Sequence, residues 1–446
     1  MEEKLLALVN RIEKLRDDGI KNSSLKPEEE SFFRWKLKDF KYGIKGIESS
    51  SAEEEYFTKP SWFRAARQLE KLIKSTDEYI SAVDVLKDNF KNRESLEQLI
   101  DSFVDQAIWR CLNAGNDLAF DKSGLVKRFI SDLEGKPATY GAKIQFQGIV
   151  LEPIQIKIPE VGVMLRQPTR DDLEKERPYW AHPFSYPAHP SAIGELSFIG
   201  HHGRDIQFRV EKLTALLRLF RVGSVKHLSY SMYTDSLIDT TSRGTISSGG
   251  QLVAIESSYI KTGDEGKLKN FIQILDPLLP PKFYRFGEGE VSHVTIAFDR
   301  YNDALLRVGI LEERIANAVM GLEALLLDAT QELSYRLGLR IAKTFSLLGD
   351  DGKQIREILK DAYRVRNLFA HGSHLSVKER RRLETKHVDL NNLLKTILDY
   401  LRRFIVLTIV IQISKEEFIF LLDDALIDKE AEVHLSNRIA IVKDIW

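Results

Sequence analysis

The hydrophobic residues of this chain change their spacing twice, and that change limits the folds that the chain can adopt. In the first 135 residues, apolar side chains recur three or four positions apart, and after Phe298 this spacing returns. From residue 143 to residue 158 they alternate instead. The first spacing indicates amphipathic helices, and alternation indicates half-buried strands. The sequence therefore predicts a multidomain, mainly α-helical protein with a mixed middle part.

We predict three parts: a helical N-terminal region at 1–135, a mixed α+β domain at 136–290 that is a candidate sensor or regulatory domain, and an up-and-down helical bundle at 291–446. The total of 446 residues is enough for two or three domains. The short run Val291 to Ile296 is expected to be strand-like. The bundle is expected to contain long helices joined by short links, namely Leu305 to Leu327, Leu333 to Leu348, Gln354 to Phe369 and Val388 to Ile413.

Composition places the protein in a reducing compartment and gives no sign of a membrane segment. The single Cys111 excludes an intrachain disulfide and a multi-cysteine zinc site. The longest apolar run, 404–413, is far shorter than the roughly 20 residues that a membrane span needs. We therefore expect a cytoplasmic protein without membrane contact. Four histidines at 182, 189, 201 and 202 match no metal-ligand spacing, so neither a metal nor another cofactor is expected.

The stretch from Tyr363 to Gly372 carries the clearest chemical signal. An apolar stripe at Ile355, Leu359 and Ala362 predicts an amphipathic helix, and Arg366 continues that stripe. An arginine on such a face needs a carboxylate, a phosphate or a partner subunit. Asn367 follows it, and His371 comes one helical turn after Asn367, just before the helix-ending Gly372. A fixed guanidinium and an imidazole together favour phosphate chemistry.

The segment around this stretch is basic, although the formal net charge of the chain is only -1. From Arg336 to Lys386 there are thirteen Lys or Arg and six Asp or Glu. Phosphate contacts would need such a patch, and a solvated charged face is the alternative interpretation. If the patch contacts a nucleic-acid backbone, the candidate residues are Arg336, Arg364, Arg380, Arg381 and Arg382.

The run from Arg366 to His371 resembles the RxxxxH ribonuclease motif of HEPN domains. The flanking Tyr363 and Gly372, the apolar run that starts at Glu323, and residues 335–340 look most like the Apea-like, abortive-infection branch of that family. The resemblance covers about the last third of the chain. It implies a HEPN-like bundle that forms a homodimer, in which the motifs of two protomers face each other and cut RNA without metal.

The resemblance also assigns roles. His371 would transfer the proton, Arg366 would neutralise the charge on the phosphorane, and Asn367 would orient the phosphate or the imidazole, giving 2′,3′-cyclic phosphate ends. Tyr363 would support the site. The family implies a role in antiviral defence. Its substrate would be RNA, with tRNA as one candidate, and its regulator would be a phage-derived trigger or a neutralising partner protein.

Two alternatives remain open from the residues themselves. Arg366 and His371 could be a helix-terminal ion pair and a cap, in a non-catalytic HEPN module that binds RNA or protein. Glu323 lies in an apolar run and needs a buried partner, for which Arg340 is the candidate. Glu323 would then be either a clamp on Arg366 or part of a structural ion pair within the bundle.

Overall fold

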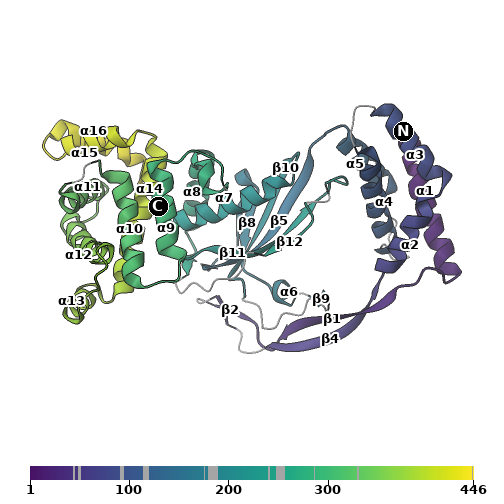
Figure 1. Cartoon of the computed structure of the whole chain (residues 1–446), viewed down its shortest axis with the longest axis horizontal. Coiled ribbons are helices and arrows are strands. Elements are labelled where there is room, and N and C mark those ends of the chain that lie inside the picture. The colour runs from purple at the N-terminus through teal and green to yellow at the C-terminus, as the bar shows by residue number, and fades with distance from the viewer. Residues whose placement is uncertain are drawn as a thin grey trace.

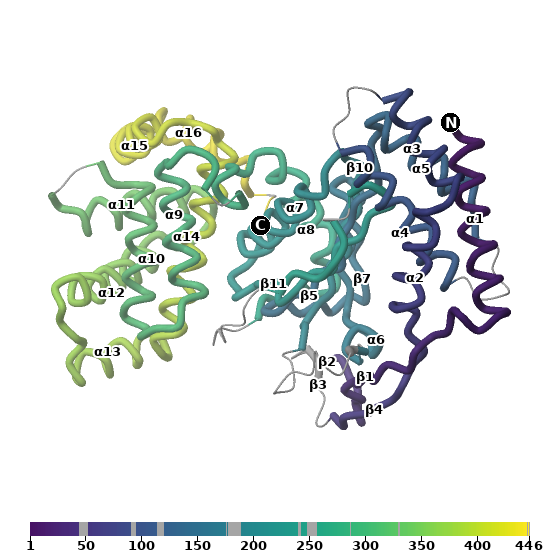
Figure 2. Tube along the Cα trace, turned by 45° about the vertical axis from the view of Figure 1, so that its right-hand side comes forward, coloured from purple at the N-terminus to yellow at the C-terminus, as the bar shows by residue number. Residues whose placement is uncertain are grey.

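The computed structural model shows an elongated molecule with helices at both ends and a sheet between them (Figure 1). It describes all residues except 44–45, 49–51, 91–94, 114–119, 175, 179–188, 240–241, 248–256, 286, 329–330, 444 and 446. A second view shows the same order, with the N-terminal helices on the far side of the sheet from the C-terminal helices (Figure 2). The predicted mainly helical fold with a mixed middle part is therefore confirmed.

The N-terminal unit is built from helices that enclose their own core. The described helices are α1 (Glu2–Lys21), α2 (Phe63–Lys74), α3 (Asp77–Asn89), α4 (Leu96–Asn113) and α5 (Lys122–Leu133). The rings of Phe103 and Phe129 stack in the middle of this core with their centroids 4.4 Å apart. Leu237, which comes much later in the chain, also lies in this core. Its N–H donates to the buried carboxylate of Asp132 over 2.7 Å. This contact ties the unit to the rest of the chain.

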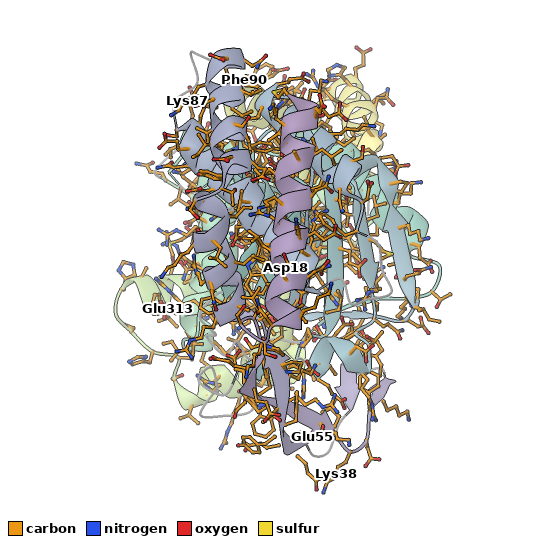
Figure 3. The ribbon with its side chains drawn as sticks, turned by 90° about the vertical axis from the view of Figure 1, so that its right-hand side faces the viewer. Asp18, Lys38, Glu55, Lys87, Phe90 and Glu313 are labelled. Atoms are coloured by element: carbon orange, nitrogen blue, oxygen red, sulfur yellow. The ribbon has the colours of Figure 1, made fainter. Side chains whose placement is uncertain are left out.

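A long β-ribbon interrupts these helices, so the prediction that residues 1–135 are helical throughout was wrong. Strand β1 (Glu28–Leu37) pairs with β4 (Ala52–Ser61) over its whole length, and the short strands are β2 (Lys41–Gly43), β3 (Gly46–Glu48) and β9 (Arg177–Pro178). Most side chains of β1 and β4 are at least partly exposed, so their apolar residues do not alternate clearly. In Figure 3, Lys38 and Glu55 lie on this ribbon, well away from Asp18 of α1.

The middle of the molecule is an antiparallel sheet with the strand order β12-β11-β5-β10-β8-β7. Its strands are β5 (Ala138–Gln147), β7 (Gln155–Ile158), β8 (Val163–Arg166), β10 (Ala192–Gly200), β11 (Lys226–Thr234) and β12 (Gly244–Ser247). Beside it, β6 (Ile149–Leu151) pairs in parallel with β13 (Ser258–Ile260). The strands predicted between 143 and 158 are confirmed.

Helices connect this sheet to the bundle. The described elements are η1 (Pro159–Val161), α6 (Arg170–Leu173), α7 (Arg204–Phe220), α8 (Glu265–Leu275), η3 (Asp276–Leu278) and η4 (Pro281–Phe283). Helix α7 buries apolar residues such as Val210 and Leu213 against the sheet. Both α7 and α8 also contact the long helix of the bundle, α14 (Leu390–Ile411).

The C-terminal bundle contains more helices than predicted. Its described elements besides α14 are α9 (His293–Leu306), α10 (Leu311–Leu326), α11 (Leu333–Leu347), α12 (Gly352–Ala370), α13 (Val377–His387), α15 (Lys415–Asp424), α16 (Lys429–Ile439) and η5 (Ala440–Val442). Helix α10 packs against α9, α12 and α14. Among the described residues, no helix is both long and apolar enough to span a lipid bilayer.

Two predicted elements of this region were wrong. The run Val291 to Ile296 is not a strand, because Ser292 accepts a hydrogen bond from the Thr295 N–H and caps α9. The long helix expected from Leu305 to Leu327 is broken at 307–310, a segment that contains Gly309, and α9 and α10 lie on either side of the break.

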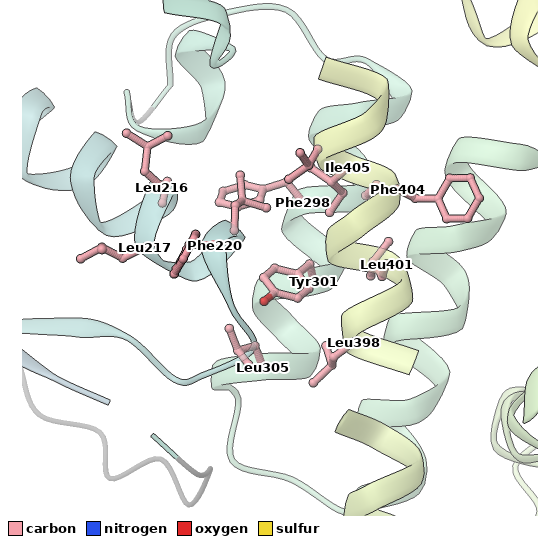
Figure 4. Close-up of a cluster of buried hydrophobic side chains, with 14 of the residues drawn as sticks. Leu216, Leu217, Phe220, Phe298, Tyr301, Leu305, Leu398, Leu401, Phe404 and Ile405 are labelled. Atoms are coloured by element: carbon pink, nitrogen blue, oxygen red, sulfur yellow. The ribbon is translucent and has the colours of Figure 1, made fainter. Parts of the chain in front are cut away.

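The sheet and the bundle share one continuous core. Leu216 and Phe220 of α7 lie in the same core as Phe298 and Tyr301 of α9, together with Ile405 of α14 (Figure 4). The Tyr301 hydroxyl donates to the main-chain oxygen of Arg218 over 2.9 Å. The guanidinium of Arg402 caps the end of α7 by donating to the carbonyls of Leu219 and Phe220 at 2.8 Å each. The bundle that carries the motif is thus held firmly on the sheet.

Candidate functional site

Helix α12 carries the motif and ends at it. Asp351 caps its first turn by accepting hydrogen bonds from the main-chain N–H groups of Lys353 and Gln354. At the other end, Gly372 has a φ of +69°, which favours glycine. The Gly372 N–H donates to Phe369 over 2.9 Å and the Ser373 N–H to Leu368 over 2.8 Å. This is a Schellman ending, and it makes His371 the C-cap residue that follows Ala370, the last residue of the helix.

Arg366 is held in place by a carboxylate from α10. Its guanidinium donates from Nη2 to Oε2 of Glu323 over 2.9 Å and from Nη1 to Oδ1 of Asn367 over 3.3 Å. It also lies over the ring of Tyr363, 5.5 Å from the centroid. The side chains of Arg366 and Glu323 are 22% and 14% exposed. This hydrogen bond between Glu323 and Arg366 is the contact that the first alternative, a clamp by Glu323, requires.

Two polar atoms of this cluster are left without a hydrogen bond to any described residue. Among the described residues, the buried Nε of Arg366 and the buried Oε1 of Glu323 have no hydrogen-bond partner. Burial, together with the charge of Glu323, raises the pKa of Tyr363 to about 12, so its phenol stays neutral at ordinary pH. Buried polar atoms without partners are rare in folded proteins and call for an explanation. No contact between described residues supplies one for these two atoms.

His371 lies at the exposed tip of the same helix. Its main-chain N–H donates to the carbonyl of Asn367 over 3.1 Å, so the two residues are one turn apart along the helix. Its side chain is exposed, and the imidazole makes no hydrogen bond or ion pair with the described residues. The ring is therefore accessible to a substrate or to another protomer. Asn367 is half-buried and lies between it and Arg366 in sequence.

Arg340 does not belong to this cluster, and its predicted pairing with Glu323 was wrong. Its guanidinium donates to Asp423 of α15 at 2.6 and 2.8 Å, to Asp328 at 3.1 Å and to the carbonyl of Leu326 at 2.6 Å. The side chain is only 2% exposed. Arg340 therefore joins α11 to α15 and to the end of α10, away from the motif.

Three of the five arginines predicted to bind RNA are engaged in ion pairs around α13. Arg364 reaches Glu379 at 3.0 Å, Arg380 contacts Glu312, and Arg382 reaches Asp361 at 2.9 Å. For Arg336 and Arg381, no ion pair is found with the described residues. The structure thus places all five in the bundle, with Arg381 exposed on α13 and Arg336 half-exposed on α11.

A buried carboxylate fastens α13 to α12, and sequence reasoning did not single it out. Asp361 is 4% exposed and accepts hydrogen bonds from Arg382 at 2.9 Å and from His387 at 2.9 Å, while Lys386 pairs with it at 2.8 Å. Burial alone would raise the pKa of Asp361, but these cationic partners outweigh it and the pKa lies below its usual value. Helix α13, which was not among the predicted helices, is thereby packed beside the motif helix.

No metal site accompanies the motif in the part of the chain that the structure describes, where no cluster of three or more possible ligand residues occurs. His201 and His202 are exposed beside the end of β10, and His182 lies outside the described residues. Comparison with family models, with curated proteins and with solved structures found no match for the chain. The geometry above is thus the basis for assigning a function.

Proposed function

We propose that the protein is a metal-independent endoribonuclease of the HEPN type, with Arg366 and His371 as its catalytic pair. One observation carries the proposal. The guanidinium of Arg366 is fixed by Glu323 five residues before an exposed histidine at the end of the same helix, and its buried Nε has no partner among the described residues. A preorganised cation next to an accessible proton-transfer group is the arrangement that phosphodiester cleavage requires.

In this mechanism the ribose 2′-hydroxyl attacks the adjacent phosphorus, and the bond to the 5′-oxygen of the next nucleotide breaks. The imidazole of His371 takes the hydroxyl proton or gives one to the leaving oxygen. Arg366 stabilises the added negative charge of the phosphorane, and Asn367 orients the phosphate or the imidazole. The products carry a 2′,3′-cyclic phosphate and a 5′-hydroxyl. DNA is resistant because it has no 2′-hydroxyl.

The proposal includes a second copy of the chain. The tip of α12 is exposed, so the motifs of two protomers can face each other across a twofold axis and place two histidines at one phosphate. Arg336 and Arg381 then have donors available for the RNA backbone, whereas Arg364, Arg380 and Arg382 must first leave their carboxylate partners. The cellular role is defence in the cytoplasm, with RNA such as tRNA as target and a phage-derived trigger or a neutralising protein as regulator.

The direct test is cleavage of a defined RNA by the purified protein in the presence of EDTA. We expect His371→Ala and Arg366→Ala each to lower the cleavage rate by about 10²- to 10⁴-fold, the usual effect of losing a positioned acid–base or charge-stabilising group. The matched controls are Arg356→Ala, an exposed arginine of the same helix, and His434→Ala, an exposed histidine of α16. Both controls should cleave at the rate of the unchanged protein.

The product ends and the substrate sugar decide whether the mechanism is correct. A 2′-O-methyl group at the cut position should block cleavage. The products of unmodified RNA should carry cyclic phosphate ends. Cleavage that persists in both motif variants, or that occurs equally on DNA, would rule out the proposed chemistry.

A non-catalytic HEPN-type module is the alternative, and the ion pairs around α13 favour it. Arg364, Arg380 and Arg382 already have carboxylate partners, so the basic segment presents less free charge than its sequence indicates. If the protein binds RNA but leaves it intact, and if Arg366→Ala does not change binding, this alternative is correct.

A further inference from the structure

A polar cavity lies far from the motif in sequence, where α7 and α8 meet the sheet. Its volume is about 260 Å³, and its floor includes Val163 of β8 and Leu196 of β10. Three cations line it, Arg209, Lys212 and Arg285. This volume is just below the ~300–1,000 Å³ usual for drug-sized ligands, so the cavity suits a ligand no larger than a mononucleotide.

Aromatic rings hold the three cations in place. The guanidinium of Arg209 lies 4.1 Å from the ring centroid of Phe198, and that of Arg285 lies 4.5 Å from the ring of Phe208. The ammonium of Lys212 is 5.3 Å from the ring of Tyr284. A ring attracts a cation through its face but, unlike a carboxylate, it cancels no charge and leaves the N–H donors at the cation's edge free.

These donors are only partly used within the chain. The guanidinium of the exposed Arg209 makes no hydrogen bond or ion pair with any described residue, although Asp205 precedes it by one helical turn. The buried Nε of Arg285 likewise has no partner among the described residues. Its outer nitrogen reaches the exposed Glu288 at 3.1 Å, and its guanidinium also interacts with the neighbouring Tyr284. Surface pairs of that kind contribute little energy. Lys212 is paired with Asp276 at 3.0 Å.

We propose that this cavity binds a small phosphomonoester of mononucleotide size. Arg209 and Arg285 bind the phosphate with their free donors, and Lys212 adds a third positive charge. The carboxylates of Asp205 and Asp276, which also line the cavity, accept hydrogen bonds from the hydroxyl or amino groups of the ligand. Because the lining combines cations with acceptors, a nucleotide fits it better than a bare phosphate does.

The site is joined to the bundle through one aromatic contact. Tyr284 and Arg285 follow Phe283, whose ring stacks on Phe298 of α9 at 3.9 Å between centroids and at an angle of 2°. Phe298 belongs to the core that the sheet and the bundle share (Figure 4). A ligand at Arg285 therefore lies two residues from a side chain on which the motif-bearing bundle is packed, which suits a site for a regulatory ligand.

Calorimetric titration of the full chain tests this proposal independently of any nuclease activity, and His371→Ala protein serves equally well. The probes are the four ribonucleoside 5′-monophosphates, the matching nucleosides and inorganic phosphate. We expect at least one monophosphate to bind with one site per chain, and its nucleoside to bind at least tenfold more weakly. Arg209→Ala and Arg285→Ala should each weaken binding about tenfold or more, the usual effect of losing a charge-assisted hydrogen bond.

Arg67→Ala is the matched control. Arg67 also lies over a ring, 5.6 Å from the centroid of Phe63, but on the exposed surface of α2 and outside the cavity, so its loss should leave binding unchanged. Thermal unfolding verifies that each variant is folded, and Arg209→Ala breaks no hydrogen bond between described residues. The proposal is wrong if no monophosphate binds below 1 mM, about the limit of weak binding, if nucleosides bind as tightly as their monophosphates, or if both cavity variants bind like the control.

Discussion

Two arginines of the bundle, Arg340 and Arg366, each pair with a carboxylate, yet their surroundings differ. Arg340 is 2% exposed and donates to two aspartates and one carbonyl. Arg366 is 22% exposed, has one carboxylate and a neighbouring amide, and keeps a buried donor without a described partner. An arginine whose donors are engaged on three sides joins elements of the fold. One with a free donor, on a helix that ends at an exposed histidine, can act on a ligand.

Arg340→Ala should have the largest effect on stability. It leaves a cavity where the buried stem was and removes the donor of the Leu326 carbonyl, so we expect a loss of about 2–4 kcal/mol in the free energy of unfolding. Denaturant titration measures it. The control is Arg438→Ala, whose exposed pair with Glu417 at 3.3 Å should contribute less than about 1 kcal/mol. A loss no larger than that of the control would remove the distinction between the two arginines.

Arg366→Ala should cost less, about 1–2 kcal/mol, because Arg366 is partly exposed and makes a single hydrogen bond to Glu323. A cycle with Glu323→Ala and the double variant measures their coupling, which we expect to be about 1 kcal/mol. If Arg366→Ala destabilises the protein as much as Arg340→Ala does, then Arg366 is a structural residue and the alternative function gains support.

The smallest effect is expected from Tyr363→Phe, and only in alkali. Burial and the charge of Glu323 raise the pKa of Tyr363 to about 12, against about 10 in the unfolded chain. The fold therefore favours the neutral phenol, and this contribution is complete below pH 10 and is lost as the pH rises towards 12. Relative to Tyr363→Phe, the unchanged protein should lose about 1 kcal/mol by pH 11.

Unfolding curves measured from pH 8 to about pH 11, which brackets the tyrosine range, test this. Tyr335→Phe, at an exposed position on α11, provides the comparison and should run parallel to the unchanged protein. A difference between the Tyr363→Phe and unchanged curves that stays constant with pH would mean that burial and Glu323 do not raise the pKa of Tyr363.

The sequence predicts those parts of the fold in which burial follows a regular period. The strands of 143–158 and the helix α12 each bury one face, so their apolar spacing is readable. The ribbon of β1 and β4 was missed because it is acidic and largely exposed, with Glu28, Glu29 and Glu30 in one strand. Helix α13 was missed for a related reason. It buries only Leu383 and His387, and charges hold it in place.

The candidate site was predicted as far as its residues lie on one helix. Arg366, Asn367 and His371 follow from their spacing along α12, and the apolar run around Glu323 indicated that it needed a partner. The sequence did not show which arginine would pair with Glu323. Arg340 pairs with Asp423, 83 residues later, because α15 folds back over α11. Such pairings between distant segments are set by the packing of helices, and no local pattern encodes them.

The interior shared by the sheet and the bundle has a consequence for communication within the molecule. Leu216 and Phe220 on one side and Phe298 on the other are parts of the same close-packed interior. Close packing lets neither side relax alone, because a displaced ring at Phe298 must be followed by its neighbours. A ligand in the cavity beside α7 would thus stiffen or shift α9 without a hinge between the sheet and the bundle. The N-terminal unit has a core that is largely its own, so it can move without disturbing the core that the sheet and the bundle share.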